Sequence, residues 1–185
     1  MSIVYALLAA FVRLNIAVAE PTRSTIPTLH TVSAPPSSSE FDHERYMRHA
    51  IREARLSKND PIGAVIVDAL TGKIIAGGAN DSHLDPTLHA EIVAIQRAAR
   101  RKNVYWRDLI LYSTAEPCPM CQSAIIWAGI PRVYYGSSIL FLEQQGLPQI
   151  DIRAAYVVAK TKFQSVEMYG GILERECNAL LIGYK

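Results

Sequence analysis

The sequence predicts an α/β fold in which one sheet lies between layers of helices. Short runs rich in β-branched and aromatic residues alternate with segments whose apolar residues recur at helical spacing. This alternation is typical of layered α/β domains. The 185 residues suffice for one hydrophobic core but not for two. Half of the residues are hydrophobic and 19% are charged, which fits a globular domain rather than a disordered chain.

An apolar stripe predicts the first helix of the domain. Asp42 or Ser39 can cap this helix, and Asn59-Asp60-Pro61 should end it. Its apolar members recur every three or four positions, and they are Tyr46, Met47, Ala50, Ile51 and Ala54.

Two β-rich runs follow, at 62–68 and 74–76, and the turn between them predicts a hairpin. A second helix is expected over 85–102. Asp85 can serve as its N-cap and Pro86 as its first helical residue, since proline is well tolerated at that position.

The second half of the chain continues the alternation. The segment 137–164 has the weakest pattern, with a short apolar piece and room for one further helix. Trp127 could wall a pocket or belong to the core. The remaining predicted strands and helices are strands at 109–114, 133–136 and 166–169, and helices at 117–128 and 171–182.

The first residues resemble a targeting segment. Residues 2–16 are largely apolar, and Ala17-Val18-Ala19 has the small-x-small pattern of a signal-peptidase site. We interpret 1–19 as a cleaved signal peptide, which would place the protein in the periplasm or outside the cell. An interfacial anchor or a mis-assigned start codon is the alternative, and without cleavage the protein would be cytoplasmic. The segment is too short, and too interrupted by polar residues, for a membrane span.

Residues 20–40 are rich in proline, serine and threonine, and we expect a flexible linker there. The folded domain is expected over 41–185.

Three cysteines are too few for a disulfide framework. Cys118 and Cys121 form a close pair that suggests a metal or redox site. Cys177 shares a helical face with Leu173 and Leu180, so we predict a buried thiol in the core.

Two local motifs predict a catalytic metal site. His89-Ala90-Glu91 and the pair Cys118 and Cys121 each stand near the start of a predicted helix. Helix N-termini carry partial positive charge, which favours thiolates. Two thiolates and one imidazole would hold Zn²⁺ and leave the fourth tetrahedral position open, as catalytic zinc sites do. Glu91 can then move protons without being a ligand.

Together the motifs resemble the His-x-Glu and Pro-Cys-x-x-Cys signature of the cytidine deaminase-like superfamily of zinc deaminases. The stretches 85–91 and 116–121 are most similar to the guanine deaminase and tRNA adenosine deaminase branches, and the resemblance runs from about 41 to 181.

This resemblance implies a three-layer α/β/α cytidine deaminase-like fold with a mixed five-stranded sheet. It also implies one Zn²⁺ per subunit and a homodimer whose neighbouring subunit helps to line the pocket. By the same resemblance Asn80 contacts the substrate base and Ala90 offers its backbone N–H to a base carbonyl. Glu116 would support the metal pair.

The substrate is less well specified. We favour a free purine base or nucleoside, guanine-like by preference, because Pro119-Met120 resembles the guanine branch. Without residues 1–19, which contain only Arg13 among charged residues, 18 basic and 17 acidic side chains leave a net charge of +1, which attracts a polyanion only weakly. A tRNA adenosine deaminase is the alternative, because the closing helix resembles that branch. Two further alternatives are a cytosine deaminase and a zinc-stabilised structural module without catalysis.

Overall fold

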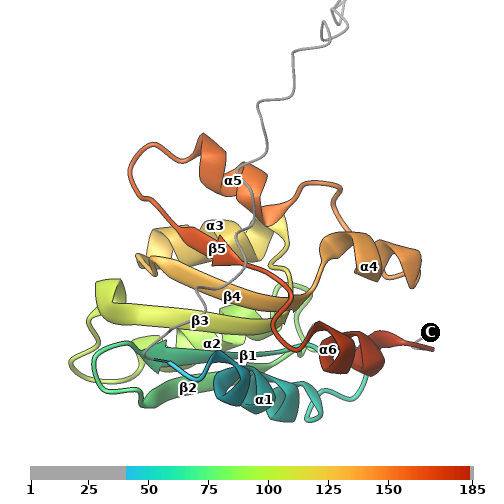
Figure 1. The fold of residues 1–185 in the computed structure, drawn as a ribbon, viewed down its shortest axis with the longest axis horizontal. Coiled ribbons are helices and arrows are strands. Elements are labelled where there is room, and N and C mark those ends of the chain that lie inside the picture. Colours follow the sequence, from blue (N-terminus) through green and yellow to red (C-terminus); the bar gives the residue numbers. More distant parts are fainter. Residues whose placement is uncertain (1–40, 184–185) are drawn as a thin grey trace, which may run out of the picture.

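A computed structural model describes residues 41–183 and confirms a mixed five-stranded sheet (Figure 1). The predicted signal peptide and linker lie outside these residues. The sheet order is β2-β1-β3-β4-β5, with β1 antiparallel to both β2 and β3, and with β3, β4 and β5 mutually parallel. The strands are β1 (Gly63–Asp68), β2 (Ile74–Ala79), β3 (Leu109–Ala115), β4 (Arg132–Ser137) and β5 (Glu167–Tyr169).

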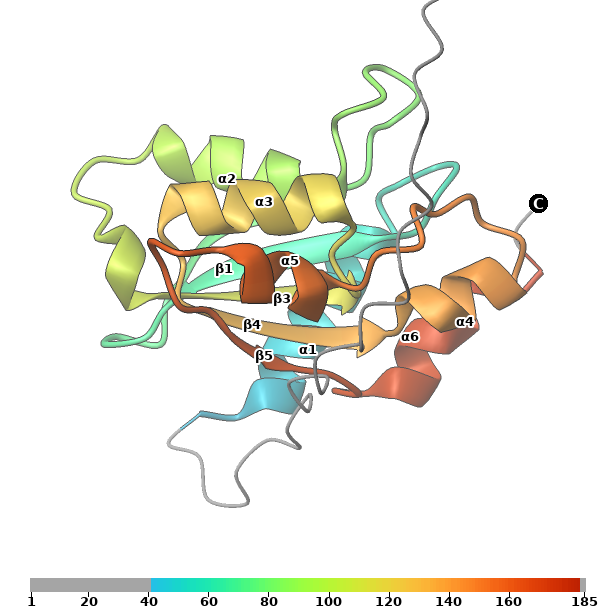
Figure 2. The ribbon, with the colours of Figure 1, turned by 90° about the horizontal axis from the view of Figure 1, so that it is seen from above.

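Six α-helices accompany the sheet, and a 3₁₀ turn, η1 (Trp106–Asp108), leads into β3. Helices α2, α3 and α5 cover one face, and α1 and α6 cover the other (Figure 2). The helices are α1 (His43–Ala54), α2 (Ala90–Ala99), α3 (Pro119–Ala128), α4 (Ile139–Gln144), α5 (Ala154–Lys160) and α6 (Glu174–Leu181).

Side-chain alternation along the strands builds a separate core on each face. In β1, Ala64 and Ile66 pack under α2 and α3, while Val65 and Val67 pack against α1. The face under α1 and α6 also contains the predicted thiol Cys177, which is free and fully buried, as the sequence suggested. Both faces are therefore sealed by apolar contacts, which fixes the helices that carry the site.

The second helix begins later than predicted. Asp85 does not cap it: its side chain instead accepts the backbone N–H of Thr87 at 2.8 Å, and its carbonyl accepts that of Leu88. These bonds make a local turn, an alternative that aspartate offers the backbone. The helix therefore starts at Ala90 with His89 as N-cap, and it ends at Ala99 rather than near 102.

Other boundaries shift by a few residues. The third helix begins at Pro119, two residues later than expected, and the closing helix begins at Glu174 after a turn in which Leu173 takes a left-handed conformation. The weakly patterned segment forms α4 and α5. Among residues 41–183, none of the helices has both the length and the apolarity needed to cross a bilayer.

Gly78 allows α2 to approach β2 closely. A Cβ at this position would overlap the backbone of Ala90 and Ala94. Because Ala90 is the first residue of α2, the missing side chain sets how near the beginning of that helix lies to the sheet.

Candidate active site

The predicted ligands converge at two helix N-termini. His89 is the N-cap of α2 and Cys118 the N-cap of α3, while Glu91 and Cys121 lie in the first turns. The His89 imidazole makes no capping hydrogen bond to its own helix, so it is directed elsewhere. At Cys118 the backbone N–H of Cys121 helps to stabilise the thiolate, and the N–H groups of both helix starts supply partial positive charge beside the sulfurs.

The three side chains fit a shared zinc ion. His89 Nδ1 lies 3.6 Å from Cys118 Sγ, and the ligand atoms of His89, Cys118 and Cys121 all lie within 4.8 Å of one another. Zinc–sulfur and zinc–nitrogen bonds of about 2.3 and 2.0–2.1 Å, at tetrahedral angles, separate the two ligand atoms by about 3.6 Å. Within the described part of the chain this cluster has three ligands, so a tetrahedral ion would keep one position for water.

The local electrostatics favour a thiolate at Cys118. Hydrogen bonding from Cys121, helped by a hydrogen bond to His89, lowers the pKa of Cys118 to about 4 despite burial. The hydrogen bond between the two cysteines raises the pKa of Cys121. The hydrogen bond between Cys118 and His89 raises the pKa of His89. One thiolate is thus already stabilised by the protein alone. A bound cation would deprotonate the second thiol too.

Glu91 is buried next to these ligands. Its side chain is 3% exposed, and its Oε1 accepts a hydrogen bond from Ser113 Oγ at 2.8 Å. Burial, and then the nearby charge of Cys118, raises the pKa of Glu91. The Ser113 contact links α2 to β3 and holds the carboxylate in one orientation.

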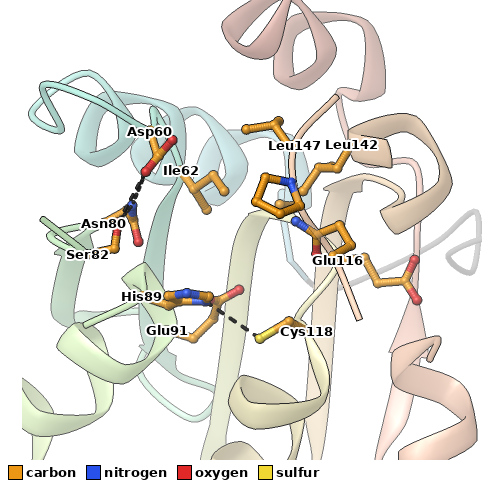
Figure 3. A pocket seen from close by; sticks show the side chains of 13 residues that line it. Asp60, Ile62, Asn80, Ser82, His89, Glu91, Glu116, Cys118, Leu142 and Leu147 are labelled. Atoms are coloured by element: carbon orange, nitrogen blue, oxygen red, sulfur yellow. Dashed lines mark hydrogen bonds between the residues drawn. The ribbon is translucent and has the colours of Figure 1, made fainter. Parts of the chain in front are cut away.

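A cavity of about 180 Å³ opens over this cluster. The volume is small against the clefts of about 300–1,000 Å³ that take drug-sized ligands, and it suits a single base. Figure 3 shows Asp60, Asn80 and Ser82 on one side of the cavity, and Leu142 and Leu147 on the other. The further lining residues are Ile62, His89, Glu91, Ala115, Glu116, Cys118, Pro148 and Gln149.

Asn80 belongs to a polar network. Its Nδ2 donates to Asp60 Oδ2 at 3.3 Å and to Ser82 Oγ at 3.0 Å, and Ser82 Oγ donates to Asp60 Oδ2 at 3.1 Å. Asn80 itself is 7% exposed and lines the cavity. The sequence suggested Asn80 as a substrate contact, but it gave Asp60 no role beyond ending a helix.

Glu116 anchors the segment that forms the opposite wall. Its carboxylate accepts hydrogen bonds from the backbone N–H groups of Ile139 and Ala154, at 3.1 and 3.0 Å, and from Arg153 Nε at 2.9 Å. Arg153 also forms an ion pair with it at 2.6 Å. Because Leu142 to Gln149 lie between these anchors, Glu116 fixes one wall of the cavity as well as preceding the cysteine pair.

Sequence reasoning missed Asp60, Ser82, Ser113 and Arg153. Asp60 directly precedes Pro61, and Ser82 lies in the loop after β2. Ser113 lies in the buried strand β3, and Arg153 precedes α5 without belonging to a motif. Only a buried serine in an apolar strand gave a signal, because a buried hydroxyl needs a partner. Ala90 opens α2, where the backbone N–H groups lack intrahelical acceptors. Its substrate contact stays a prediction.

Comparison with known proteins agrees with this geometry. Residues 40–137 match the family described as the cytidine and deoxycytidylate deaminase zinc-binding region. The tRNA-specific adenosine deaminase of Rickettsia bellii is 36% identical over 146 residues, which cover 75% of this chain and 96% of that protein. The guanine deaminase of Bacillus subtilis is 42% identical over 104 residues, which cover 52% of this chain and 65% of that protein.

A solved structure shares the fold. The guanine deaminase from Nitrosomonas europaea superposes with a TM-score of 0.65 at 23% identity, covering 81% of this chain and 84% of that one. The matched region contains the imidazole, the thiol pair and the buried carboxylate described above. The chain therefore belongs to the cytidine and deoxycytidylate deaminase zinc-binding family, and it is a zinc-dependent deaminase, a hydrolase of C–N bonds.

Proposed function

We propose that the enzyme deaminates a free purine base or nucleoside, with guanine preferred. The charge of the cavity carries this proposal. Its lining includes the carboxylates of Asp60, Glu91 and Glu116, and none of its described lining residues is lysine or arginine. A polynucleotide needs cations along its phosphates, whereas a neutral base does not.

One basic cluster among the described residues lies far from this cavity. Arg100, Arg101 and Lys102 are exposed and follow the C-terminus of α2, whereas His89 precedes its N-terminus. Ten helical residues separate the two ends by about 15 Å. These cations complement the helix dipole at its negative end and leave the mouth of the cavity without them.

The chemistry follows from the residues at the base of the cavity. We propose that His89, Cys118 and Cys121 hold the zinc ion. Bound by these residues, zinc would supply a water molecule whose pKa is lowered to about 7. In the overall reaction a C–O bond forms at the ring carbon, the exocyclic C–N bond breaks, and ammonia leaves.

Glu91 is proposed as the proton carrier. Its carboxylate takes a proton from the attacking water and delivers protons to a ring nitrogen and to the departing amine. Ser113 keeps Oε1 in place during this transfer. Asn80 and the backbone N–H of Ala90 would orient the base, because Asn80 lines the same cavity as the proposed ligand His89 and Ala90 follows that ligand in the chain.

An ammonia-release panel tests the substrate. The substrates are guanine, guanosine, adenosine, cytosine and a tRNA anticodon stem-loop, with zinc content measured in parallel. We expect the highest kcat/KM for guanine or guanosine. Release of ammonia from the stem-loop alone would contradict the proposal.

A tRNA adenosine deaminase is the second candidate. The observation in its favour is similarity over nearly the full length of the Rickettsia bellii enzyme, against 65% of the Bacillus subtilis guanine deaminase. The salt dependence of kcat/KM separates the two, since each phosphate contact adds to the salt slope and a neutral base gives almost none.

We also propose a homodimer, on the basis of an exposed aromatic pair. Trp127 on α3 is 77% exposed and packs at a tilt against Phe163, which is 61% exposed, with ring centroids 4.8 Å apart. Trp127 thus lies neither in the core nor in the cavity, and the two alternatives expected from the sequence are both wrong. A second copy covering this pair would pack on the last turn of the helix whose first turn carries Cys121. Sedimentation of wild type and Trp127→Glu tests this: a monomeric wild type contradicts it.

The signal peptide also stays a prediction. N-terminal sequencing of the protein from its own host tests it, because an intact Met1 excludes cleavage after Ala19.

A further inference from the structure

We propose that Asp60 and Ser82 lock the Asn80 amide so that its oxygen faces the ligand, which makes the cavity selective for bases with a ring N–H donor. This inference rests on the proposed function, and it names Asp60 as a specificity-determining residue.

The hydrogen bonds of the Asn80 side-chain amide support this proposal. A side-chain amide has two N–H donors on Nδ2 and one carbonyl acceptor, Oδ1. Nδ2 donates to both Asp60 and Ser82, whose acceptor atoms lie 3.1 Å apart on the same side of the amide. The Ser82 hydroxyl proton is used as well, because it is donated to Asp60. Among the described residues, none bonds Asn80 Oδ1, so this oxygen is the atom left for a ligand.

The direction of the amide is fixed by chemistry. The assignment of oxygen and nitrogen in an asparagine depends on its partners. A carboxylate accepts hydrogen bonds and cannot donate them, so Asp60 requires Nδ2 on its side. A reversed amide would put two oxygens 3.3 Å apart, and it would leave Ser82 with two acceptors to serve through a single proton. The network therefore allows only one orientation.

An outward-facing oxygen discriminates between bases. It pairs with a ring N–H and repels a ring nitrogen that carries a lone pair. Guanine offers N1–H and an imidazole N–H. In adenosine and cytidine every ring nitrogen of the base is an acceptor or is blocked by the sugar, and the only donor is the amine that leaves. An adenosine ring would face Oδ1 lone pair to lone pair in the locked orientation.

The location of the network suits this role. Figure 3 shows Asp60, Asn80 and Ser82 together on one side of the cavity, apart from His89 and Cys118. Backbone bonds hold the frame: the Asn80 N–H donates to Ile62 at 2.9 Å, and the Ile62 N–H donates to Asp60 at 2.6 Å. A change at Asp60 leaves the metal ligands in place, but it also removes a charge that helps to raise the pKa of His89. Zinc content therefore has to be measured beside substrate choice.

The experiment compares guanine with two analogues that keep the 2-amino group. 2-Aminopurine lacks N1–H, and 9-methylguanine lacks the imidazole N–H. The ratio of kcat/KM for guanine over each analogue is measured for wild type, Ser82→Ala and the double variant Asp60→Leu with Ser82→Ala. Asp81→Asn is the matched control, because it removes one nearby negative charge without touching Asn80. Zinc content shows that each variant is folded.

In the wild type we expect one analogue to lose roughly tenfold to a hundredfold in kcat/KM, the cost of an unpaired buried acceptor. In the double variant the amide can turn, and the loss should shrink to below about threefold, with Ser82→Ala between the two. Asp81→Asn should match the wild type. An unchanged ratio in the double variant, or no loss with either analogue, overturns the inference. A wild type without guanine turnover overturns the proposed function instead.

Discussion

The two sides of the cavity are built in different ways. The metal side consists of two helix N-termini, and its residues come from motifs of three and five consecutive positions, His89-Ala90-Glu91 and 117–121. The other two sides are built from residues near 60 and 80 and from residues near 147, which line one cavity only after folding. A helix start places its own side chains, so reaction chemistry is encoded locally. In the function we propose, recognition of the base depends on tertiary contacts, and we expect that it can change without altering the reaction.

Loss of a metal ligand should have the largest effect. Cys118→Ala removes one thiolate, and two ligands do not hold catalytic zinc, so we expect zinc loss and no ammonia release. Elemental analysis with an activity assay measures both. Cys177→Ala is the matched control, because that thiol lies in the core on the other face of the sheet. Full zinc occupancy in Cys118→Ala would remove this residue from the ligand set.

Glu91→Gln should separate chemistry from metal binding. The amide keeps the size of the side chain but cannot take a proton, so kcat should fall by about 10²–10⁴ while zinc is retained. Steady-state kinetics on guanine, with zinc analysis, checks this. Wild-type kcat in this variant would mean that another group moves the proton.

Glu116→Gln should act on the other wall of the cavity. It leaves Arg153 without its ionic partner and removes an acceptor from Ile139 or Ala154. Because the Arg153 side chain is 29% exposed, losing this pair should cost about 1–3 kcal/mol, which denaturant unfolding should detect. KM should rise more than kcat falls, because the wall at 142–149 binds rather than reacts. Arg153→Lys keeps the charge and should lie between. A pure loss of kcat with unchanged KM would contradict this assignment.

Ser113→Ala should have a smaller effect. It removes one hydrogen bond from Glu91, and such a bond to a charged group is worth about 1.5–3 kcal/mol, or roughly tenfold to a hundredfold in rate if it acts only in the transition state. Ser113→Thr keeps the hydroxyl and should restore most of kcat. Equal losses in Ala and Thr variants would indicate a packing role instead.

The smallest expected effect concerns stability on the face away from the site. Burial, and then the charge of Arg132, lowers the pKa of His43, which hydrogen-bonds Tyr112 at 2.8 Å; Asp42 opposes the shift. A histidine with a lowered native pKa binds fewer protons folded than unfolded, so its contribution is full at high pH and is lost as the pH falls below 6.5. Denaturant unfolding between about pH 7.5 and 5.5 should show a steeper loss for wild type than for His43→Phe. Equal pH dependence of the unfolding free energy in wild type and His43→Phe would contradict this role of His43.

The same contrast explains which features of the fold and the site could be predicted from the sequence. The five strands follow from β-branched runs, and the metal cluster follows from motif spacing, because both depend on local pattern. The start of α2 does not, since Asp85 could cap a helix or close a turn and only the tertiary position of His89 decides between them. The roles of Asp60 and Arg153 could not be predicted from local pattern, because their hydrogen-bond partners Asn80 and Glu116 lie 20 and 37 residues away in the sequence.

The composition of the metal site tests the account most directly. X-ray absorption at the zinc edge of the purified protein should show two sulfurs at about 2.3 Å and two nitrogen or oxygen atoms at about 2.0–2.1 Å, one of them from water. Replacement of that light atom by a third sulfur, or a zinc ion absent from active protein, would contradict the assignment of His89, Cys118 and Cys121 as the complete protein ligand set.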